Sequence, residues 1–299
     1  MAVSIIDVNE NGLISWDPKI LVTLLADKTT TNNILWATND YVFLGNEYNE
    51  KMPITIEAIT GSNSNIIQPR VVKSSDAQWN RQKRKAEVFT PAWVCNQQNN
   101  LIDDEWFQKK HIFNSPERFS WKTTKQKISF LDKKGSRWQD YVDAKRIEIT
   151  CGEAPYLASR YDMITGEFIQ IPNRIGLLDR KLRVVYENTT SLEEWIIWAT
   201  RAIQSTYGFE YQGDNLIIAR ENILLTFIEN MQYYYHQIPN IKLLLKIANI
   251  IAWNIWQMDG TTYKVPFAKS DNEAVYCKIH DWRSKKTNLF IELARKDAH

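Results

Sequence analysis

The chain has 299 residues, of which 44% are hydrophobic and 24% charged, so it can fold around one large core or two modest ones. Its formal net charge is only +2, which excludes proteins that bind polyanions through bulk charge. The sequence has no run of about eighteen apolar residues and no signal-peptide pattern, so a cytoplasmic protein without a membrane anchor is expected.

The cysteines indicate neither a disulfide framework nor a metal centre. Cys95, Cys151 and Cys277 are odd in number and far apart, which predicts reduced thiols. Cys277 and His280 form the nearest thing to a zinc-ligand pair, and a structural zinc site needs two more ligands. No bound metal is therefore predicted.

The first 80 residues alternate short apolar runs with turn signals. The runs cover residues 20–25, 34–37 and 54–59. This pattern predicts a small α+β region with one helix and several strands.

Residues 81–145 are predicted to form a basic connector and a helical segment. Residues 78–85 are polar and basic, and residues 96–100 indicate a loop before a short helix near residue 102. Two basic stretches, at residues 70–85 and 122–146, could follow a phosphate backbone or could be ordinary solvated surface. Trp79, Trp93, Trp121 and Trp138 lie near them and are candidates for stacking on bases or for packing in a core.

Residues 146–299 alternate predicted strands and helices. Strands are expected at residues 147–150, 205–211 and 249–257, and a capping box at Ser191 and Glu194 predicts the start of a helix. A second helix is predicted over residues 215–235, and a short one after Pro239. This order predicts an α/β fold with a partial parallel sheet of Rossmann type.

A candidate ligand-binding segment lies at the end of each of the three predicted strands. These segments are Cys151, Gly152, Glu153 and Ala154 after the first, Glu210 near the end of the second and Asp259 after the third. Ligands of open parallel sheets bind beyond the carboxyl ends of the strands. An adenosine-containing cofactor needs a close turn, an acid for the ribose hydroxyls and a polar group for the adenine amine, and this set offers all three.

Together with Phe89-Thr90-Pro91, these segments resemble the cofactor motifs of the gamma-order DNA adenine methyltransferases of restriction-modification systems. The resemblance covers roughly residues 86–260 and implies S-adenosylmethionine as cofactor. It implies that Phe89, Thr90 and Pro91 cover the methionine end and that Cys151, Gly152, Glu153 and Ala154 wrap the amino acid moiety. It further implies that Glu210 holds the ribose, that Tyr211 packs on the base and that Asp259 meets the adenine.

Each segment also has a simpler interpretation. Thr90 and Pro91 could merely begin a helix, Cys151 could be an inert thiol, Glu210 a surface acid and Asp259 a turn residue. Two departures from the family pattern are evident. Ala154-Pro155 replaces the flexible second glycine of the loop, and residues 158–190 read as an insertion before the next helix.

The catalytic tetrapeptide of these enzymes, Asn or Asp followed by two prolines and an aromatic residue, is missing. No two prolines are adjacent, and the nearest candidate, Lys264-Val265-Pro266-Phe267, begins with a side chain that donates hydrogen bonds but cannot accept them. The chain also ends within about forty residues of Asp259. No catalytic residue is therefore predicted.

Three hypotheses follow. The chain is a methyltransferase-like module of a restriction-modification or phage-defence system, which needs a second subunit for catalysis and target recognition on DNA. Alternatively, it is an inactive relative that binds nucleic acid or protein. A third alternative is an unrelated enzyme such as a nuclease, for which Asp143-Ala144-Lys145 is the candidate site.

Overall fold

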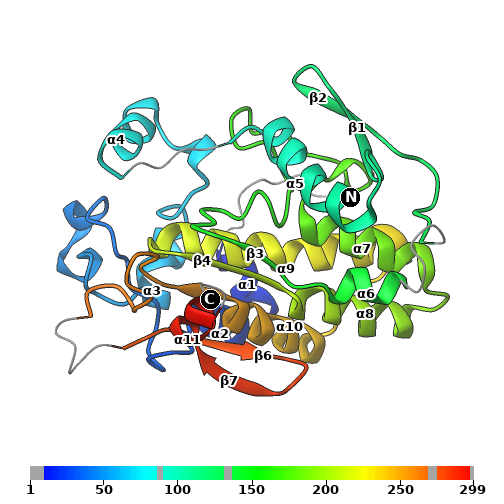
Figure 1. The fold of residues 1–299 in the computed structure, drawn as a ribbon. Helices are drawn as coiled ribbons and strands as arrows, with labels where there is room; N and C mark the ends of the chain where they lie inside the picture. Colours follow the sequence, from blue (N-terminus) through cyan, green and yellow to red (C-terminus); the bar gives the residue numbers. More distant parts are fainter. Residues whose placement is uncertain (1–9, 86–89, 131–136, 269–274, 297–299) are drawn as a thin grey trace.

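The computed structural model describes residues 10–85, 90–130, 137–268 and 275–296 (Figure 1). The N-terminal part contains α1 (Glu10–Trp16), α2 (Pro18–Leu25), α3 (Ile56–Ile59), α4 (Ser75–Lys85) and α5 (Ala92–Phe107). The middle contains β1 (Asn114–Glu117), β2 (Ser120–Thr123), α6 (Trp138–Asp143), β3 (Arg146–Glu148), α7 (Leu177–Asn188) and α8 (Leu192–Gln204). The remainder contains β4 (Thr206–Glu210), α9 (Gly213–Tyr235), α10 (Ile241–Asn254), β5 (Ile255–Gln257), β6 (Lys278–Asp281), β7 (Lys286–Leu289) and α11 (Phe290–Lys296).

The centre of the molecule is a parallel sheet with the strand order β3-β4-β5. Ile147 lies opposite Tyr207, and Gly208 lies opposite Ile255. Parallel neighbours need long crossover connections, and here the pairs α7–α8 and α9–α10 supply them. The predicted α/β class with a parallel sheet is therefore confirmed, although the Rossmann type remains a prediction because three strands do not define it.

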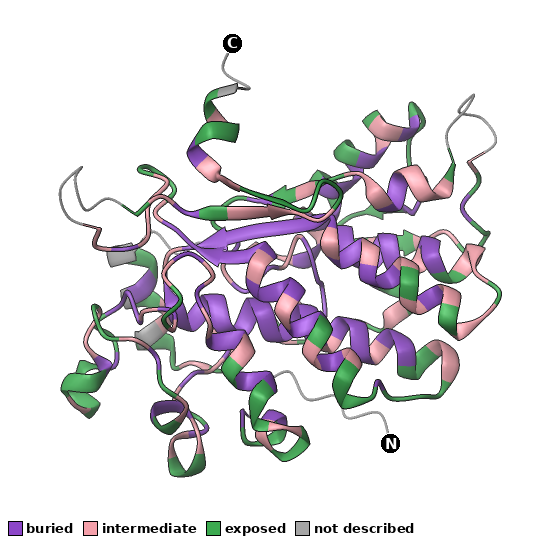
Figure 2. Cartoon of the chain, turned by 90° about the horizontal axis from the view of Figure 1, so that it is seen from below, coloured by how far each residue is buried: buried purple, intermediate pink, exposed green. Residues whose placement is uncertain are grey.

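The helices and the N-terminal region share one hydrophobic core. Buried side chains of α2, α8, α9 and α10 form a single cluster that extends from Leu13 to Ile255. In Figure 2 the central strands and the helices beside them are largely purple, the colour of buried residues. The other face of the sheet packs on the β6–β7 hairpin and α11, where Tyr207 donates a hydrogen bond to the His280 carbonyl (3.2 Å) and Phe209 contacts Phe290.

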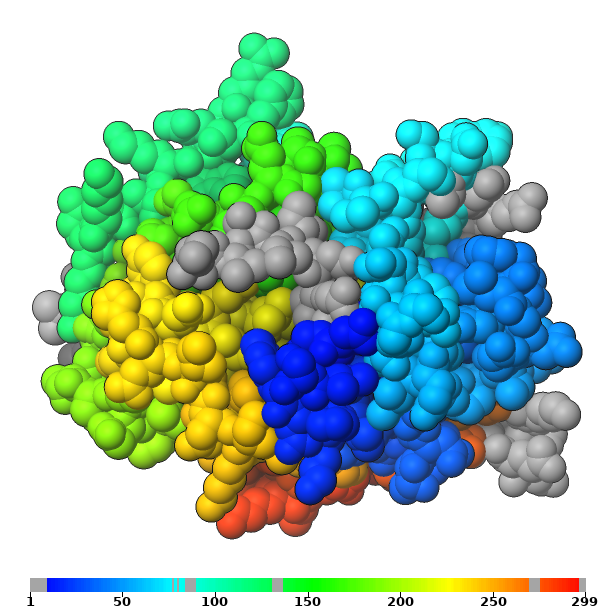
Figure 3. Space-filling view, turned by 180° about the vertical axis from the view of Figure 1, so that it is seen from behind, coloured from blue at the N-terminus to red at the C-terminus, as the bar shows by residue number. Residues whose placement is uncertain are grey.

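The several strands predicted for the N-terminal region are not found among its described residues. Residues 20–25 lie in the helix α2, and within residues 34–37 only Leu35 makes an isolated bridge, to Pro53. These residues instead lie beside the central sheet: the Gln257 side chain bonds both the N–H and the C=O of Leu35, each at 2.8 Å. Figure 3 shows this region, in blue, against the yellow and orange segments of the chain that contain α9 and α10.

Two predicted loops are helical. Residues 78–85 belong to α4, and residues 96–100 lie inside α5. The asparagines of α5 are buried because their amides have partners: Asn96 bonds Asn114 (2.8 Å), and Asn99 bonds the Tyr156 and Ile175 carbonyls (both 3.0 Å). A composition that is typical of turns therefore occurs here in a packed helix.

The segments that connect β3 with β4 and β4 with β5 also differ in part from the prediction. Residues 249–254 end α10, so only Ile255–Gln257 form the strand β5. The predicted helix at Ser191 is confirmed, since the Ser191 hydroxyl accepts from the Glu194 N–H (3.2 Å). Residues 158–190, which were interpreted as an insertion, already contain the helix α7, whose Asp179, Arg180 and Lys181 are buried.

Gly213, at the start of α9, tests the contact between the N-terminal region and the sheet. Its N–H donates to the Trp36 carbonyl (2.9 Å), and a Cβ there would lie 2.0 Å from the Leu35 carbonyl oxygen. Gly213→Ala should therefore lower the free energy of unfolding by about 1–3 kcal/mol, measured by urea denaturation, because backbone must move.

Gly12→Ala in α1 is the matched control. A Cβ at Gly12 meets nothing within 4 Å, so alanine should raise the stability by about 0.5–1 kcal/mol through its better helix propensity. Equal effects of the two substitutions would contradict the close approach at Gly213.

Candidate functional site

The loop after β3 has an unusual backbone. Thr150, Gly152 and Ala154 all have positive φ angles, of 48°, 53° and 63°. Residues other than glycine rarely adopt this conformation, and such strain is concentrated at functional sites. Hydrogen bonds hold the loop in place: Cys151 N–H donates to the Phe209 carbonyl (2.8 Å) and Ala154 N–H to the Cys151 carbonyl (2.7 Å).

Cys151 and Ala154 point into the protein. Both are buried and belong to the main core cluster. Gly208 of β4 makes room for the thiol, since a Cβ at Gly208 would lie 3.3 Å from the Cys151 sulfur. Burial raises the pKa of the Cys151 thiol well above its usual value and so disfavours the nucleophilic thiolate.

Glu210 joins the ends of the first two strands. It is the last residue of β4, and its carboxylate accepts hydrogen bonds from the N–H groups of Gly152 (2.9 Å) and Gln212 (3.1 Å). The side chain is buried rather than a surface acid. Burial raises the pKa of Glu210, although these backbone hydrogen bonds oppose the shift.

Glu148, the last residue of β3, was missed by the sequence analysis. Its carboxyl faces the backbone of Tyr156 and Leu157, and its Oε2 has no hydrogen-bond partner among the described residues. Burial raises the pKa of this group well above its usual value. The available signal was a lone charged residue between Ile147 and Ile149 in a short apolar strand.

Glu153 holds the loop to its surroundings. Its side chain accepts from the Arg70 N–H (2.7 Å) and from the Tyr161 hydroxyl (2.6 Å), and its carbonyl accepts from the Asn222 amide (2.9 Å). The carboxylate is completely buried, so its role in the structure is to position the loop.

Thr90 lies against this loop. A side-chain hydrogen bond joins Thr90 to Tyr156, and the Thr90 carbonyl accepts from the Cys95 thiol (3.7 Å). Pro91 immediately precedes α5, whose first N–H, at Ala92, donates to Asp162 (2.7 Å). Two segments about sixty residues apart in sequence thus meet. Phe89 lies outside the described residues.

Tyr211 directly follows β4, and Asp259 lies two residues beyond the end of β5. Asp259 accepts from the Thr261 N–H (2.8 Å) and hydroxyl (2.6 Å), an arrangement that fits its simpler interpretation as a turn residue. Burial would raise the pKa of Asp259, but these hydrogen bonds lower it. Burial and the charge of Asp259 raise the pKa of Tyr211, whose ring lies 6.1 Å from that of Phe267. Tyr211 and Asp259 are therefore neighbours.

The charged residues of Asp143-Ala144-Lys145, the candidate nuclease site, form ion pairs. The Asp143 carboxylate forms ion pairs with Arg201 and Arg283, and Lys145 pairs with Asp281 (2.9 Å). In the described part of the chain, no three His, Cys, Asp or Glu side chains gather so that they could hold a metal ion. Asp143 and Lys145 are therefore both engaged with charged partners.

No protein-family model, curated protein or solved structure matches this chain. Over the residues described, no helix is long and apolar enough to cross a lipid bilayer.

The buried Glu148 predicts a pH dependence of stability. Its folded-state pKa is raised, so its contribution is fully present below the unfolded pKa of about 4.3 and is lost as the pH rises through the folded value. Between about pH 5 and pH 8, the free energy of unfolding of wild-type protein should therefore fall relative to that of Glu148→Gln, measured by urea denaturation at both pH values. The exposed Glu193→Gln on α8 should behave like wild type. Parallel pH profiles for Glu148→Gln and wild type would contradict the raised folded-state pKa of Glu148.

Proposed function

We propose that this chain is a methyltransferase-like module of a DNA restriction-modification or phage-defence system, which binds S-adenosylmethionine at the carboxyl ends of β3, β4 and β5. The observation that carries the proposal is the pair of buried carboxyl groups, Glu148 and Glu210, at adjacent strand ends. Neither forms an ion pair within the described residues, and burial raises the pKa of both.

A cationic ligand with hydroxyl groups suits such a pair. S-adenosylmethionine carries an ammonium group, a sulfonium group and two ribose hydroxyls. Buried carboxyl groups without a counter-ion favour a ligand that supplies positive charge or hydrogen-bond donors. When bound, the cofactor would supply an activated methyl group, and the residues of this chain would hold and orient it.

The roles proposed for individual residues follow their places at the sheet edge. Glu210 would accept hydrogen bonds from the ribose hydroxyls while it holds Gly152, and Tyr211 would pack against the adenine near Asp259. Thr90, Pro91 and the loop Cys151-Gly152-Glu153-Ala154 would enclose the methionine end. The methyl group of Ala154 lies in the core, so it does not obstruct this side of the loop.

Methyl transfer is proposed to need a partner chain. No two prolines are adjacent in the 299 residues, so the tetrapeptide that positions the adenine amine is missing. Lys264 cannot replace it: its backbone bridges Asp259 and Tyr276, and its ammonium lies 5.2 Å from the Tyr276 ring centroid. The partner would supply the groups that accept hydrogen bonds from the adenine amine and would recognise the target sequence. The two chains would act together on DNA in the cytoplasm.

A second candidate is an inactive relative that binds nucleic acid or protein. The observation that favours it is the rigid Ala154-Pro155 sequence, which replaces a flexible glycine in a loop already held by hydrogen bonds. Cofactor binding separates the two candidates.

Calorimetric titration with S-adenosylmethionine tests the donor site. Glu210→Gln keeps an acceptor oxygen for Gly152 but removes the charge, so it should weaken binding by about 1.5–3 kcal/mol, as expected for a hydrogen bond to a charged group. Glu193→Gln, on the exposed side of α8, is the matched control and should bind like wild type. A wild-type protein that gives neither heat nor a thermal shift with excess cofactor would refute the proposal.

A transfer assay tests the need for a partner. The purified chain should transfer no label from methyl-labelled S-adenosylmethionine to duplex DNA, because it lacks acceptor groups for the adenine amine. The same preparation must bind the cofactor by calorimetry. Methylated adenine formed by the chain alone would contradict the partner requirement but not the donor site.

A further inference from the structure

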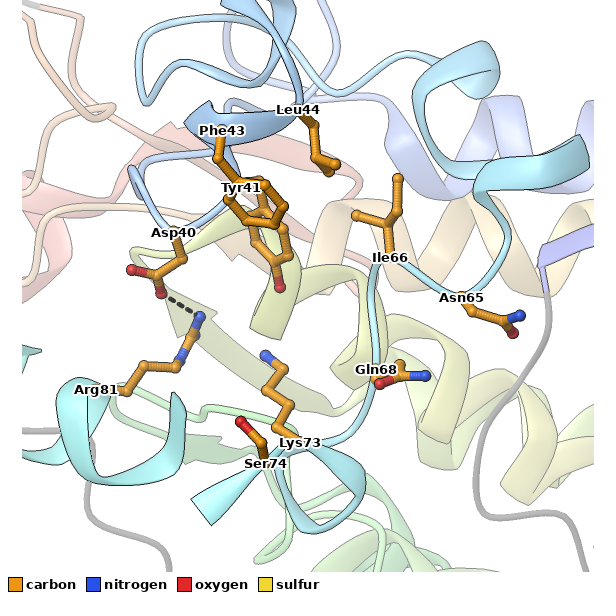
Figure 4. Close-up of a pocket in the computed structure, with 10 residues that line it drawn as sticks. All are labelled: Asp40, Tyr41, Phe43, Leu44, Asn65, Ile66, Gln68, Lys73, Ser74 and Arg81. Carbon is orange, nitrogen blue, oxygen red and sulfur yellow. Dashed lines mark hydrogen bonds and ion pairs between the residues drawn. The ribbon is translucent and has the colours of Figure 1, made fainter. Parts of the chain in front are cut away.

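A cavity of about 520 Å³ lies on the N-terminal side of α9 (Figure 4). Its walls come from the 3-10 turn Val42–Leu44 with the residues before it, from residues 65–68, from residues 73–74 just before α4, and from Arg81 within α4. The lining residues are Asp40, Tyr41, Phe43, Leu44, Asn65, Ile66, Gln68, Lys73, Ser74 and Arg81. A volume of this size suits a small molecule or a single nucleoside unit.

One side of the cavity is formed by a cluster of charged side chains that bond to one another. Asp214 of α9 accepts from the Tyr41 hydroxyl (2.8 Å), Lys73 (3.2 Å) and Arg81 (2.8 Å), and Arg81 also pairs with Asp40 (2.7 Å). Two cations therefore face two carboxylates, so the formal charge of the cluster is zero. A free anion gains little electrostatic stabilisation from this neutral cluster, whereas a neutral ligand with hydrogen-bond donors and acceptors can bond to it.

The opening of the cavity is apolar and aromatic. Val42, Phe43 and Leu44 are consecutive and have exposed fractions of 45%, 79% and 41%. Adjacent exposed hydrophobic side chains are uncommon on a protein surface and mark binding regions. Figure 4 shows the Phe43 ring close to Tyr41 among the residues that line the cavity.

Polar side chains with unused hydrogen-bonding capacity complete the lining. Asn65 and Gln68 border the cavity, and neither amide has a hydrogen-bond partner among the described residues. Each amide offers two donors and one acceptor oxygen. This is the inventory needed to bond the edge of a nucleobase, which also carries donors and acceptors in one plane.

The outward side of α4 extends the surface. Trp79 is 56% exposed, and the Lys83 ammonium lies 4.1 Å from the centroid of its ring. Exposed aromatic rings beside basic side chains are typical of surfaces that bind single-stranded nucleic acid.

We propose that this cavity receives one unstacked base of a single-stranded nucleic acid segment. The base stacks on Phe43, its edge bonds Asn65 and Gln68, and the phosphate backbone follows the outward side of α4 past Lys83. This inference does not rest on the donor site. It does place the base near that site, because Arg81 bonds the Gln212 side chain (3.1 Å) and Gln212 N–H donates to Glu210 (3.1 Å).

Fluorescence anisotropy with a labelled single-stranded DNA of about 12 nucleotides, at low ionic strength, tests the proposal, since single-strand sites cover roughly 4–16 nucleotides. Phe43→Ala should weaken binding about tenfold or more, and Gln68→Ala should weaken it by a smaller factor. The matched control is Phe119→Ala, which removes another exposed phenylalanine (64%) on the β1–β2 turn and should change binding less than about twofold. Unchanged thermal midpoints establish that each variant is folded.

Three results would overturn the proposal. The first is no binding by wild-type protein. The second is equal affinity of wild type and Phe43→Ala, in which case the aromatic opening serves another partner such as a protein. The third is equal affinity for a strand of the same length that lacks bases, which would reduce the interaction to phosphate contacts. Because S-adenosylmethionine is not part of this assay, failure here leaves the calorimetric test of the donor site independent.

Discussion

The arrangement of the N-terminal region depends on one buried carboxylate, that of Asp214 in the first turn of α9. A carboxylate without access to water is costly unless hydrogen bonds and cations compensate it. Tyr41, Lys73 and Arg81 provide this compensation from distant parts of the chain. Burial alone would raise the pKa of Asp214, but Arg81 and Lys73 hold it well below its usual range. The ionised group therefore ties these segments to the end of β4.

Local signals in the sequence predicted the elements that depend on local physics. The helix of α9 and the cap of α8 follow from apolar periodicity and from one serine hydroxyl, so both are confirmed. The errors arose where distant contacts override composition. The asparagines of α5 look like a loop until Asn114 and the Tyr156 carbonyl supply partners, and residues 34–37 look like a strand until Gln257 binds their backbone.

The candidate site was predictable in position but not in detail. Parallel strands bring their carboxyl ends to one edge, so the neighbourhood of Gly152 and Glu210 followed from the order of strands and helices. The sequence offered a lone charge between Ile147 and Ile149 as a signal for Glu148 but did not indicate its burial, which depends on the backbone of Tyr156 and Leu157. It also could not find the cavity at Phe43, whose walls come from three separate segments.

The left-handed backbone of Thr150 and Ala154 has a consequence for kinetics. Such conformations persist only when the surrounding structure imposes them, and here Phe209 and the core do so. The loop is thus ordered during folding rather than during binding, which removes an entropic penalty from any later association. The rate at which a ligand reaches this loop would then be set by its access to the sheet edge, with no slow rearrangement of the loop in between.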